Sequence, residues 1–323
     1  MIAAAPGDPA SCLICLRPVP SGEYHVTCLR RIYGSDTPPR IDLTEATLRT
    51  VALATLGRTV MPGVQPKISV GLARDRRRTL RVEAGGGRQR FILKPQNAEL
   101  VALPENEHLS MQIARLFGVL VPDNGLIRLA DGGLAYIVAR FDRLPDGRKL
   151  RQEDFAQLGG LMPSEKYDAT GADCARIVER YSSRAGADLV RLFERFVLAY
   201  WVGDGDMHMK NLSLLAEAKG RHGLSPAYDI VCSSVYGQEG CSSAPALDLG
   251  PGDERATRDT WFRFADACRL PGPAARAILR RPAQRLAAAE GLVARSYLRS
   301  RPMRVKYTET LRARADALET VAR

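Results

Sequence analysis

The sequence predicts an α+β protein in which a small β-rich lobe precedes a mainly helical lobe. The chain has 323 residues, of which 45% are hydrophobic and 26% charged. This is ordinary globular composition, and the length allows one large domain or two lobes. Short strand-like segments predominate before residue 145, and helical spacing predominates after it. We therefore expect a Cys-rich module at residues 1–40, a β-rich lobe at 41–147 and a helical lobe at 148–323.

Residues 1–40 are rich in Cys, Pro and Gly, which indicates a small module dominated by loops. Within it, Cys12-x-x-Cys15 and His25-x-x-Cys28 form two pairs of ligand-type side chains. Three Cys and one His are a known ligand set for tetrahedral Zn²⁺, and an ion with all four positions filled by protein is structural. The alternative is that these cysteines are small apolar side chains buried in a loop without metal.

Three short segments of the second lobe are predicted strands joined by tight turns. They are residues 67–73, 79–83 and 89–94. A helix begins at Pro104 and ends at Gly118, because its apolar side chains recur at helical spacing and glycine commonly stops a helix. Residues 126–129 and 134–138 flank Asp131-Gly132-Gly133 and predict a further hairpin. We therefore expect a sheet with one helix inserted after its third strand.

The third region contains a helix that Asp188 can cap and that extends through Trp201. Its apolar side chains cover so much of the circumference that the helix must be largely buried. It leads into residues 203–211, where two Asp, one His, one Lys and one Asn follow within nine residues. Such a density of polar groups beside a buried helix is costly unless the groups face a ligand or water.

Asp206 and Asn211 have the spacing Asp-x-x-x-x-Asn. In the catalytic loop of protein kinases, this spacing offers a carboxylate to the acceptor hydroxyl and an amide oxygen to a Mg²⁺ ion. Asp229 follows eighteen residues later and is a candidate second metal ligand. Residues 212–215, with a turn at Lys219-Gly220, predict a hairpin that returns Asp229 to the neighbourhood of Asn211.

Lys94 is the candidate for the cation that bound phosphates require, since it closes the predicted strand 89–94 and the chain has only seven lysines. Glu107, on the following helix, would complete the lysine and glutamate pair that kinases use to fix the nucleotide phosphates. The alternative is that a lysine at a strand end faces solvent and protects a sheet edge. The order of strand lysine, helix glutamate, Asp-to-Asn loop and final Asp favours the kinase interpretation.

Eight motifs, in order, resemble those of the HipA serine/threonine kinase toxins. They are Gly63–Lys67, Phe91–Pro95, Leu103–Glu107, Arg140–Arg143, Arg151–Phe155, Lys166-Tyr167, Gly203–Asn211 and Ala227–Asp229. The resemblance runs from about Val60 to Ser233, and the short start is more similar to HipT-type members. It implies a two-lobed protein-kinase-like fold that uses ATP and Mg²⁺. It also implies the toxin of a toxin–antitoxin operon, whose HipB-like helix-turn-helix antitoxin binds the operator DNA. Known members phosphorylate an aminoacyl-tRNA synthetase.

The resemblance implies roles for the residues that match its motifs. Asp206 would be the catalytic base, and Asn211 and Asp229 would hold Mg²⁺. Lys94 would contact the ATP phosphates, with Glu107 as its partner.

Two further parts of the nucleotide site are implied in the same way. His208 would line the phosphate side, and Ala139-Arg140-Phe141 would be the hinge that contacts adenine. The family frequently has Glu where Ala139 stands, so the hinge contact would be made by the backbone or be lost.

Two other functions compete with a protein kinase. The first is a small-molecule phosphotransferase on the same fold, which also uses Asp-x-x-x-x-Asn. The second is a non-catalytic regulator that binds zinc and nucleic acid. Residues 274–323 carry twelve basic and four acidic side chains, within a net charge of +11, and would supply its basic face. The plainer interpretation of that segment is a solvated face of Arg-rich helices.

The sequence also bears on location. No segment approaches the ~18 apolar residues of a membrane helix, and residues 1–10 lack the basic start and apolar core of a signal peptide. We therefore expect a cytoplasmic protein with no membrane partner. Seven cysteines, an odd number, suit a reducing compartment better than a disulfide framework.

Overall fold

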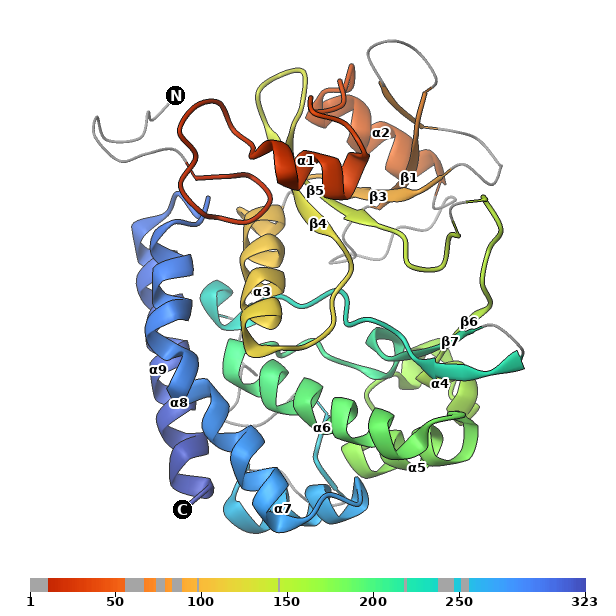
Figure 1. Cartoon of the computed structure of the whole chain (residues 1–323), viewed down its shortest axis with the longest axis vertical. Coiled ribbons are helices and arrows are strands. Elements are labelled where there is room, and N and C mark those ends of the chain that lie inside the picture. The colour runs from red at the N-terminus through yellow and green to blue at the C-terminus, as the bar shows by residue number, and fades with distance from the viewer. Residues whose placement is uncertain are drawn as a thin grey trace. The chain divides into compact units, whose positions relative to one another are not determined.

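The computed structural model describes residues 11–55, 67–73, 79–82, 89–97, 99–144, 146–217, 220–237, 247–250 and 256–323. The chain forms two compact units, whose elements are labelled in Figure 1. The first unit comprises the described residues up to Gln112, with Pro122–Arg148 and Ala294–Arg299. The second comprises the described parts of Ile113–Val121, Lys149–Val293 and Ser300–Arg323. Helices and antiparallel sheets together confirm the predicted α+β class.

A five-stranded antiparallel sheet with the order β2-β1-β3-β5-β4 forms the centre of the first unit. Its strands are β1 Ile68–Leu72, β2 Leu80–Val82, β3 Phe91–Lys94, β4 Asn124–Arg128 and β5 Leu134–Ala139. The helix α3, Leu103–Phe117, follows the third strand as predicted and ends at Gly118, whose φ is 103°. The predicted strands, inserted helix and later hairpin are thereby confirmed.

The Cys-rich module contains a helix that its composition did not predict. This helix, α1, spans Val26–Tyr33 and ends at Gly34, whose φ of 63° is left-handed. Its buried face consists of Cys28, Leu29, Ile32 and Tyr33. These side chains share one hydrophobic core with the strands of the sheet, and Ile41 and Leu48 continue that core. The core therefore has no break near residue 40. The helix α2, Glu45–Thr55, contacts β1 (Figure 1).

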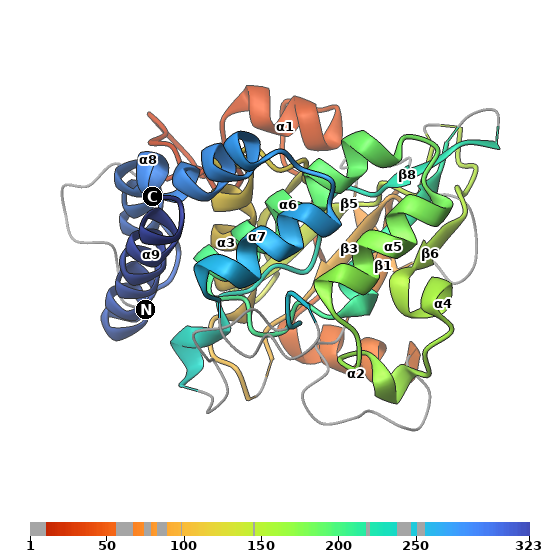
Figure 2. The ribbon, with the colours of Figure 1, turned by 90° about the horizontal axis from the view of Figure 1, so that it is seen from below.

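The second unit is mainly helical. Its helices are α4 Phe155–Gly159, α5 Gly171–Tyr181, α6 Ala185–Val202, α7 Arg258–Ala267, α8 Gly272–Ala294 and α9 Arg301–Val321. A small antiparallel sheet has the order β6-β7-β8, with β6 Gln152–Asp154, β7 Ser213–Ala216 and β8 His222–Leu224. The pairing of β7 with β8 confirms the hairpin predicted after residue 212. Figures 1 and 2 show α5 lying beside α6.

The predicted cap of the long buried helix is wrong. The helix α6 begins at Ala185, and Asp188 lies inside its first turn. The Asp188 carboxylate is fully buried and accepts hydrogen bonds from the Ser182 hydroxyl (2.7 Å) and the Leu224 backbone N–H (2.8 Å). It therefore joins α6 to β8, a tertiary contact that propensity at a helix start does not reveal. The burial of α6 itself is confirmed.

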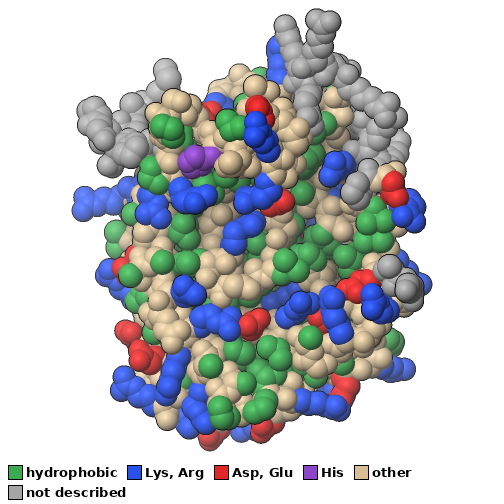
Figure 3. Space-filling model, in the orientation of Figure 1, with side chains coloured by type: hydrophobic (Ala, Val, Ile, Leu, Met, Phe, Trp, Pro, Cys, Tyr) green, Lys and Arg blue, Asp and Glu red, His purple; other side chains and the backbone are tan. Residues whose placement is uncertain are grey.

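The Arg-rich helices α8 and α9 lie side by side in both ribbon views (Figures 1 and 2). Arg281 of α8 donates to Glu194 of α6 at 2.8 Å, and Arg314 of α9 donates to the Tyr200 carbonyl at 2.6 Å. On the face drawn in Figure 3, Lys and Arg side chains are spread widely, with Asp and Glu among them. Several arginines of this segment therefore stabilise packing within the unit.

Among the helices that the structure describes, none has both the length and the apolar character that crossing a membrane requires.

Candidate active site

Lys94 and Glu107 form a buried ion pair in the first unit. Lys94 Nζ donates to Glu107 Oε1 at 2.6 Å, and the two residues are only 5% and 1% exposed. Tyr136, the register partner of Lys94 on β5, places its ring centroid 5.6 Å from the ammonium nitrogen. A lysine that protects a sheet edge would face solvent, whereas Lys94 lies on a strand paired on both sides. The solvent-facing alternative is therefore wrong.

The predicted adenine hinge follows β5 in the same unit. The Arg140 guanidinium donates twice to the Asp142 carboxylate, at 2.9 and 2.7 Å, and once to the Ser69 hydroxyl of β1, at 3.0 Å. The Arg140 backbone N–H donates to the Arg90 carbonyl at 2.8 Å. Phe141 is partly buried. The Arg140 side chain is thus held inside the unit, and a hinge contact with adenine stays a prediction.

The segment 203–211 leaves α6 through Gly203, a position that requires glycine. Its φ is 81°, and a Cβ atom there would lie 2.6 Å from Ser234 Oγ. The Ser233 hydroxyl accepts from the Gly205 N–H at 2.6 Å and donates to the Gly203 carbonyl at 3.1 Å. The chain just after Asp229 therefore fixes the start of the loop that carries Asp206.

Asp206 is exposed, and its carboxylate accepts a hydrogen bond from the Tyr167 hydroxyl. Burial raises the pKa of Tyr167, and the bond to Asp206 raises it further. Tyr167 belongs to one of the motifs quoted above, but sequence reasoning gave it no role. The bond shows that the Asp206 carboxylate lies where a hydroxyl group can reach it.

Asp204 is the other acid of this loop, and sequence reasoning gave it no role. It is only 2% exposed, and its carboxylate accepts the Asp206 backbone N–H at 3.0 Å. Burial raises the pKa of Asp204 well above its usual range, and the charges of Asp206 and Asp229 contribute to the rise. The repeated Gly-Asp of residues 203–206 was the available signal, since the first acid anchors the backbone of the second.

His208 lies between exposed Asp206 and buried Asn211 on the same loop. It is 9% exposed, and burial lowers its pKa, which favours the neutral imidazole. The Tyr167 ring meets it edge-on, with ring centroids 5.2 Å apart. Its Nδ1 atom is buried without a hydrogen-bond partner among the described residues. A buried polar atom without a partner is uncommon, and the position of His208 beside a phosphate stays a prediction.

Asn211 and Asp229 are neighbours in the second unit. The Asn211 side-chain N–H group lies 3.5 Å from the Asp229 carbonyl oxygen, and Asn211 is 9% exposed. An amide that donates through its nitrogen retains its oxygen as a ligand atom. Asp229 has a φ of 57°, which is unfavourable for a residue with a side chain and is often found at functional sites. The oxygen donors of these two residues fit a hard cation such as Mg²⁺.

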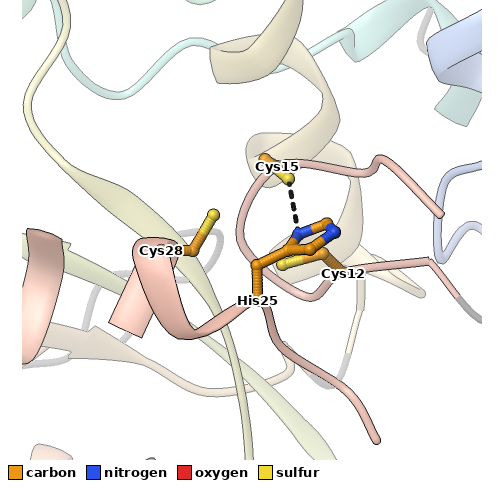
Figure 4. Close-up of side chains that lie close together, drawn as sticks. All are labelled: Cys12, Cys15, His25 and Cys28. Atoms are coloured by element: carbon orange, nitrogen blue, oxygen red, sulfur yellow. Dashed lines mark hydrogen bonds between the residues drawn. The ribbon is translucent and has the colours of Figure 1, made fainter. Parts of the chain in front are cut away.

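The four Cys and His residues of the N-terminal module converge, as Figure 4 shows. The ligand atoms of Cys12, Cys15, His25 and Cys28 all lie within 4.8 Å of one another. Cys15 Sγ lies 3.4 Å from His25 Nδ1. The hydrogen bond between the Cys12 and Cys15 thiols raises the pKa of Cys12 and lowers that of Cys15. This set belongs to the first unit.

The predicted residues therefore form three groups, of which two lie in the first unit and one in the second. The first unit joins Lys94 with Glu107, and the second gathers Asp206, His208, Asn211 and Asp229. Of the motif 63–67, residues 63–66 lie outside the described residues.

The chain resembles curated proteins over about half of their length. The chain is 34% identical over 216 residues to the protein named "Putative kinase Y4dM" of Sinorhizobium fredii, which covers 63% of this chain and 51% of the relative. It is 33% identical over 173 residues to the protein named "Putative kinase" of Haemophilus influenzae, covering 49% of this chain and 50% of the relative. The chain thus spans about half the length of the curated relatives it matches.

Two solved structures share the fold. The first is HipA of Shewanella oneidensis, in its complex with HipB and operator DNA, with a TM-score of 0.66 at 19% identity, covering 82% of this chain and 67% of that one. The second is the kinase CtkA of Helicobacter pylori, with a TM-score of 0.53 at 14% identity, covering 72% and 88%. The predicted kinase-like fold is confirmed.

The family model of the HipA-like C-terminal domain matches residues 59–290. The chain therefore belongs to the HipA-like C-terminal domain family.

Proposed function

We propose that the protein is an ATP- and Mg²⁺-dependent protein serine/threonine kinase. One observation carries this proposal above the others. The second unit holds Asp206, Asn211 and Asp229 on two segments tied together by hydrogen bonds. These are the carboxylate, amide and carboxylate that phosphoryl transfer requires.

The residues of this set fit Mg²⁺ and ATP. Asn211 and Asp229 would hold Mg²⁺ through their side-chain oxygens, and Lys94 would contact the nucleotide phosphates. When bound, Mg-ATP supplies the γ-phosphoryl group and the metal charge that offsets its negative oxygens. Glu107 keeps Lys94 in one position through the 2.6 Å contact, so little rotamer freedom is lost when phosphate binds.

Asp206 would accept the proton of the acceptor hydroxyl as its oxygen attacks phosphorus and the bond to ADP breaks. Its carboxylate already accepts the hydroxyl of Tyr167, so the required hydrogen-bond geometry is attainable. Neutral His208, with its Nδ1 atom buried and unpartnered among the described residues, would lie against the phosphates.

A toxin role is the finer part of the proposal. It is supported by the fold shared with HipA of Shewanella oneidensis, which the solved structure shows with HipB and operator DNA. By that likeness, a HipB-like helix-turn-helix antitoxin would bind this chain and carry it to operator DNA. The acceptor would be a protein of translation, such as an aminoacyl-tRNA synthetase. The set Cys12, Cys15, His25 and Cys28 is assigned no part in the transfer step.

Phosphoproteomics after brief induction tests both levels of the proposal. Cells that express the wild-type chain should gain phosphoserine or phosphothreonine on a small set of proteins, and cells that express Asp206→Asn should not. An aminoacyl-tRNA synthetase within that set would support the proposed target. Equal phosphorylation by the two chains would contradict a catalytic role for Asp206.

A further inference from the structure

The cysteine cluster has the dimensions of an occupied metal site. A tetrahedral Zn²⁺ ion with Zn–S bonds of about 2.3 Å and a Zn–N bond of about 2.0 Å separates its ligand atoms by about 3.5–3.8 Å. All four ligand atoms here lie within 4.8 Å of one another, and Cys15 Sγ lies 3.4 Å from His25 Nδ1. The four side chains point toward one another, as ligands of a single ion would (Figure 4).

His25 presents the correct ring nitrogen to the cluster. Its Nε2 atom lies 3.0 Å from the Pro18 carbonyl oxygen, which can only accept a hydrogen bond. Nε2 therefore carries the proton, and in the neutral ring Nδ1 keeps its lone pair toward Cys15. Metal-binding histidines are commonly oriented in this way, by donating their second nitrogen to a carbonyl group.

The backbone around the first two cysteines supports thiolate ligands. The Ile14 N–H donates to Cys12 Sγ at 3.4 Å, and the positively charged Arg17 follows Cys15 by two positions. Three thiolates and one Zn²⁺ leave a single negative charge, which Arg17 can offset. Leu16 has a φ of 57°, a left-handed conformation that is unfavourable for a residue with a side chain. A metal that draws Cys12 and Cys15 together would help to maintain that turn.

The same loop contacts β4 closely. The Leu126 N–H donates to the Leu13 carbonyl at 2.7 Å, and the Tyr24 hydroxyl donates to the Leu126 carbonyl at 3.3 Å. At Gly125, a Cβ atom would lie 2.9 Å from Ile14 Cγ1 and 3.2 Å from the Leu13 carbonyl oxygen. The loop between Cys12 and Cys15 therefore packs on the strand where only glycine leaves room.

The loop also contacts the helix that carries Glu107. His108 Nε2 donates to the Ile14 carbonyl oxygen at 3.0 Å, and His108 is 1% exposed. His108 is the next residue after Glu107 on α3, and Ile14 lies between two of the metal-ligand candidates. A fixed loop thus gives α3 a fixed hydrogen-bond partner beside the ion pair with Lys94.

We propose that Cys12, Cys15, His25 and Cys28 hold one structural Zn²⁺ ion, which fixes their loop against β4 and α3 and so stabilises the helix that presents Glu107 to Lys94. Metal binding and the stabilisation of α3 stand without the kinase proposal. Only the resulting effect on nucleotide affinity rests on the proposed function.

Metal analysis of the purified full chain tests the site. We expect one zinc per chain in the wild type and in Cys268→Ser, which changes a buried cysteine of the second unit, and a loss of zinc in Cys15→Ser. If Cys15→Ser fails to fold, chelated wild type refilled with Co²⁺ gives the answer. Tetrahedral thiolate absorption is expected. A metal-free wild type, undiminished zinc in a folded Cys15→Ser, or an octahedral Co²⁺ spectrum would overturn the site.

Hydrogen exchange tests the coupling to α3. Chelation should speed amide exchange in residues 103–112 and at Leu126, and leave α5 of the second unit unchanged. Gly125→Ala, which keeps all four ligands but crowds Ile14, should retain one zinc and show the same faster exchange. Unchanged exchange in residues 103–112 after chelation would overturn the coupling.

Nucleotide binding separates this inference from the kinase proposal. ATP affinity should fall about fivefold or more on zinc removal, the usual lower range for coupled sites. Unchanged affinity alongside faster exchange would contradict the effect on the Lys94 pair. A zinc-loaded wild type that binds no ATP would contradict the proposed function and leave the metal site standing.

Discussion

The two units hold their charged groups in opposite ways. In the first, Lys94 and Glu107 neutralise each other in a buried contact of 2.6 Å. In the second, Asp204, Asp206 and Asp229 place like charges near one another, and the pKa of Asp204 is raised by burial and by its two neighbours. The first group is complete without a ligand, whereas the second is destabilised by negative charge that a cation would offset. The Lys94–Glu107 pair is therefore preformed, and the like charges of the second group are what the proposed binding of Mg²⁺ would offset.

The largest expected effect is on the acidic group of the second unit. Asp206→Asn removes the carboxylate that would accept the proton of the acceptor hydroxyl, and kcat for phosphate transfer should fall about 10²–10⁴-fold. Because Asp206 is exposed, thermal stability should stay within a few degrees of wild type. Steady-state kinetics and a melting curve check both statements. The matched control Asp266→Asn, an exposed acid on α7, should keep wild-type kcat.

The next effect concerns the stability that the pair of Lys94 and Glu107 gives to the first unit. Lys94→Met leaves Glu107 buried without its cation, which should cost about 3–5 kcal/mol of unfolding free energy. The double variant Lys94→Met/Glu107→Leu removes both charges and should cost less than the single one. Urea unfolding gives the free energy of unfolding of wild type, the single variant and the double variant. Lys149→Met, at an exposed lysine, is the control. A single variant as stable as wild type would show that the pair is not buried in solution.

A smaller effect is expected at Tyr167. Tyr167→Phe keeps the ring against His208 but removes the hydroxyl that bonds to Asp206. If that bond positions the carboxylate, kcat should fall roughly tenfold, which corresponds to about 1.4 kcal/mol, with the KM for ATP unchanged. Tyr181→Phe, at the end of α5, is the control and should leave both constants unchanged. A loss confined to KM would instead indicate a role in binding.

The smallest effect concerns the stability contribution of Asp204, and its size depends on pH. The folded-state pKa lies above the unfolded value of about 3.9, so the folded state binds more protons in that range. The stabilising contribution of protonated Asp204 is therefore present at low pH and lost as pH rises through the folded pKa. Asp204→Asn removes this dependence and should be more stable than wild type at pH 8, with a gap that narrows toward pH 5. Urea unfolding at both pH values checks this, and a gap that widens on acidification would contradict the assigned direction.

The sequence predicted elements better than it predicted their ends and partners. Alternation and turn residues located β1, β3, β4 and β5, because side-chain period and turn chemistry are local properties. Asp188 was assigned as a cap because propensity cannot show that Ser182 and Leu224 would bond to it inside the fold. The helix α1 was missed because it is short and lies within a segment that reads as loop by composition, although Leu29 and Ile32 lie on its buried face.

The candidate site was predictable where spacing along the chain carried the information. Asp206 and Asn211 share one loop, and a hairpin of fixed length returns Asp229 to Asn211. Tyr167 and Asp204 received no role, since the first reaches Asp206 across 39 positions and the second acts through a backbone N–H. The tertiary contact of Tyr167 leaves no period in a sequence, whereas the local bond of Asp204 was signalled by the repeated Gly-Asp of residues 203–206.

The central claim is that the acidic group requires Mg²⁺ and that the lysine group receives the phosphates. Calorimetric titration of ATP with and without Mg²⁺ tests it most directly, in wild type, Asp229→Asn and Lys94→Met. Mg²⁺ should tighten ATP binding to the wild type and to Lys94→Met, and should have little effect on Asp229→Asn. Lys94→Met should bind ATP more weakly than wild type in both conditions. An Asp229→Asn chain whose ATP affinity responds to Mg²⁺ as strongly as the wild type would contradict the account.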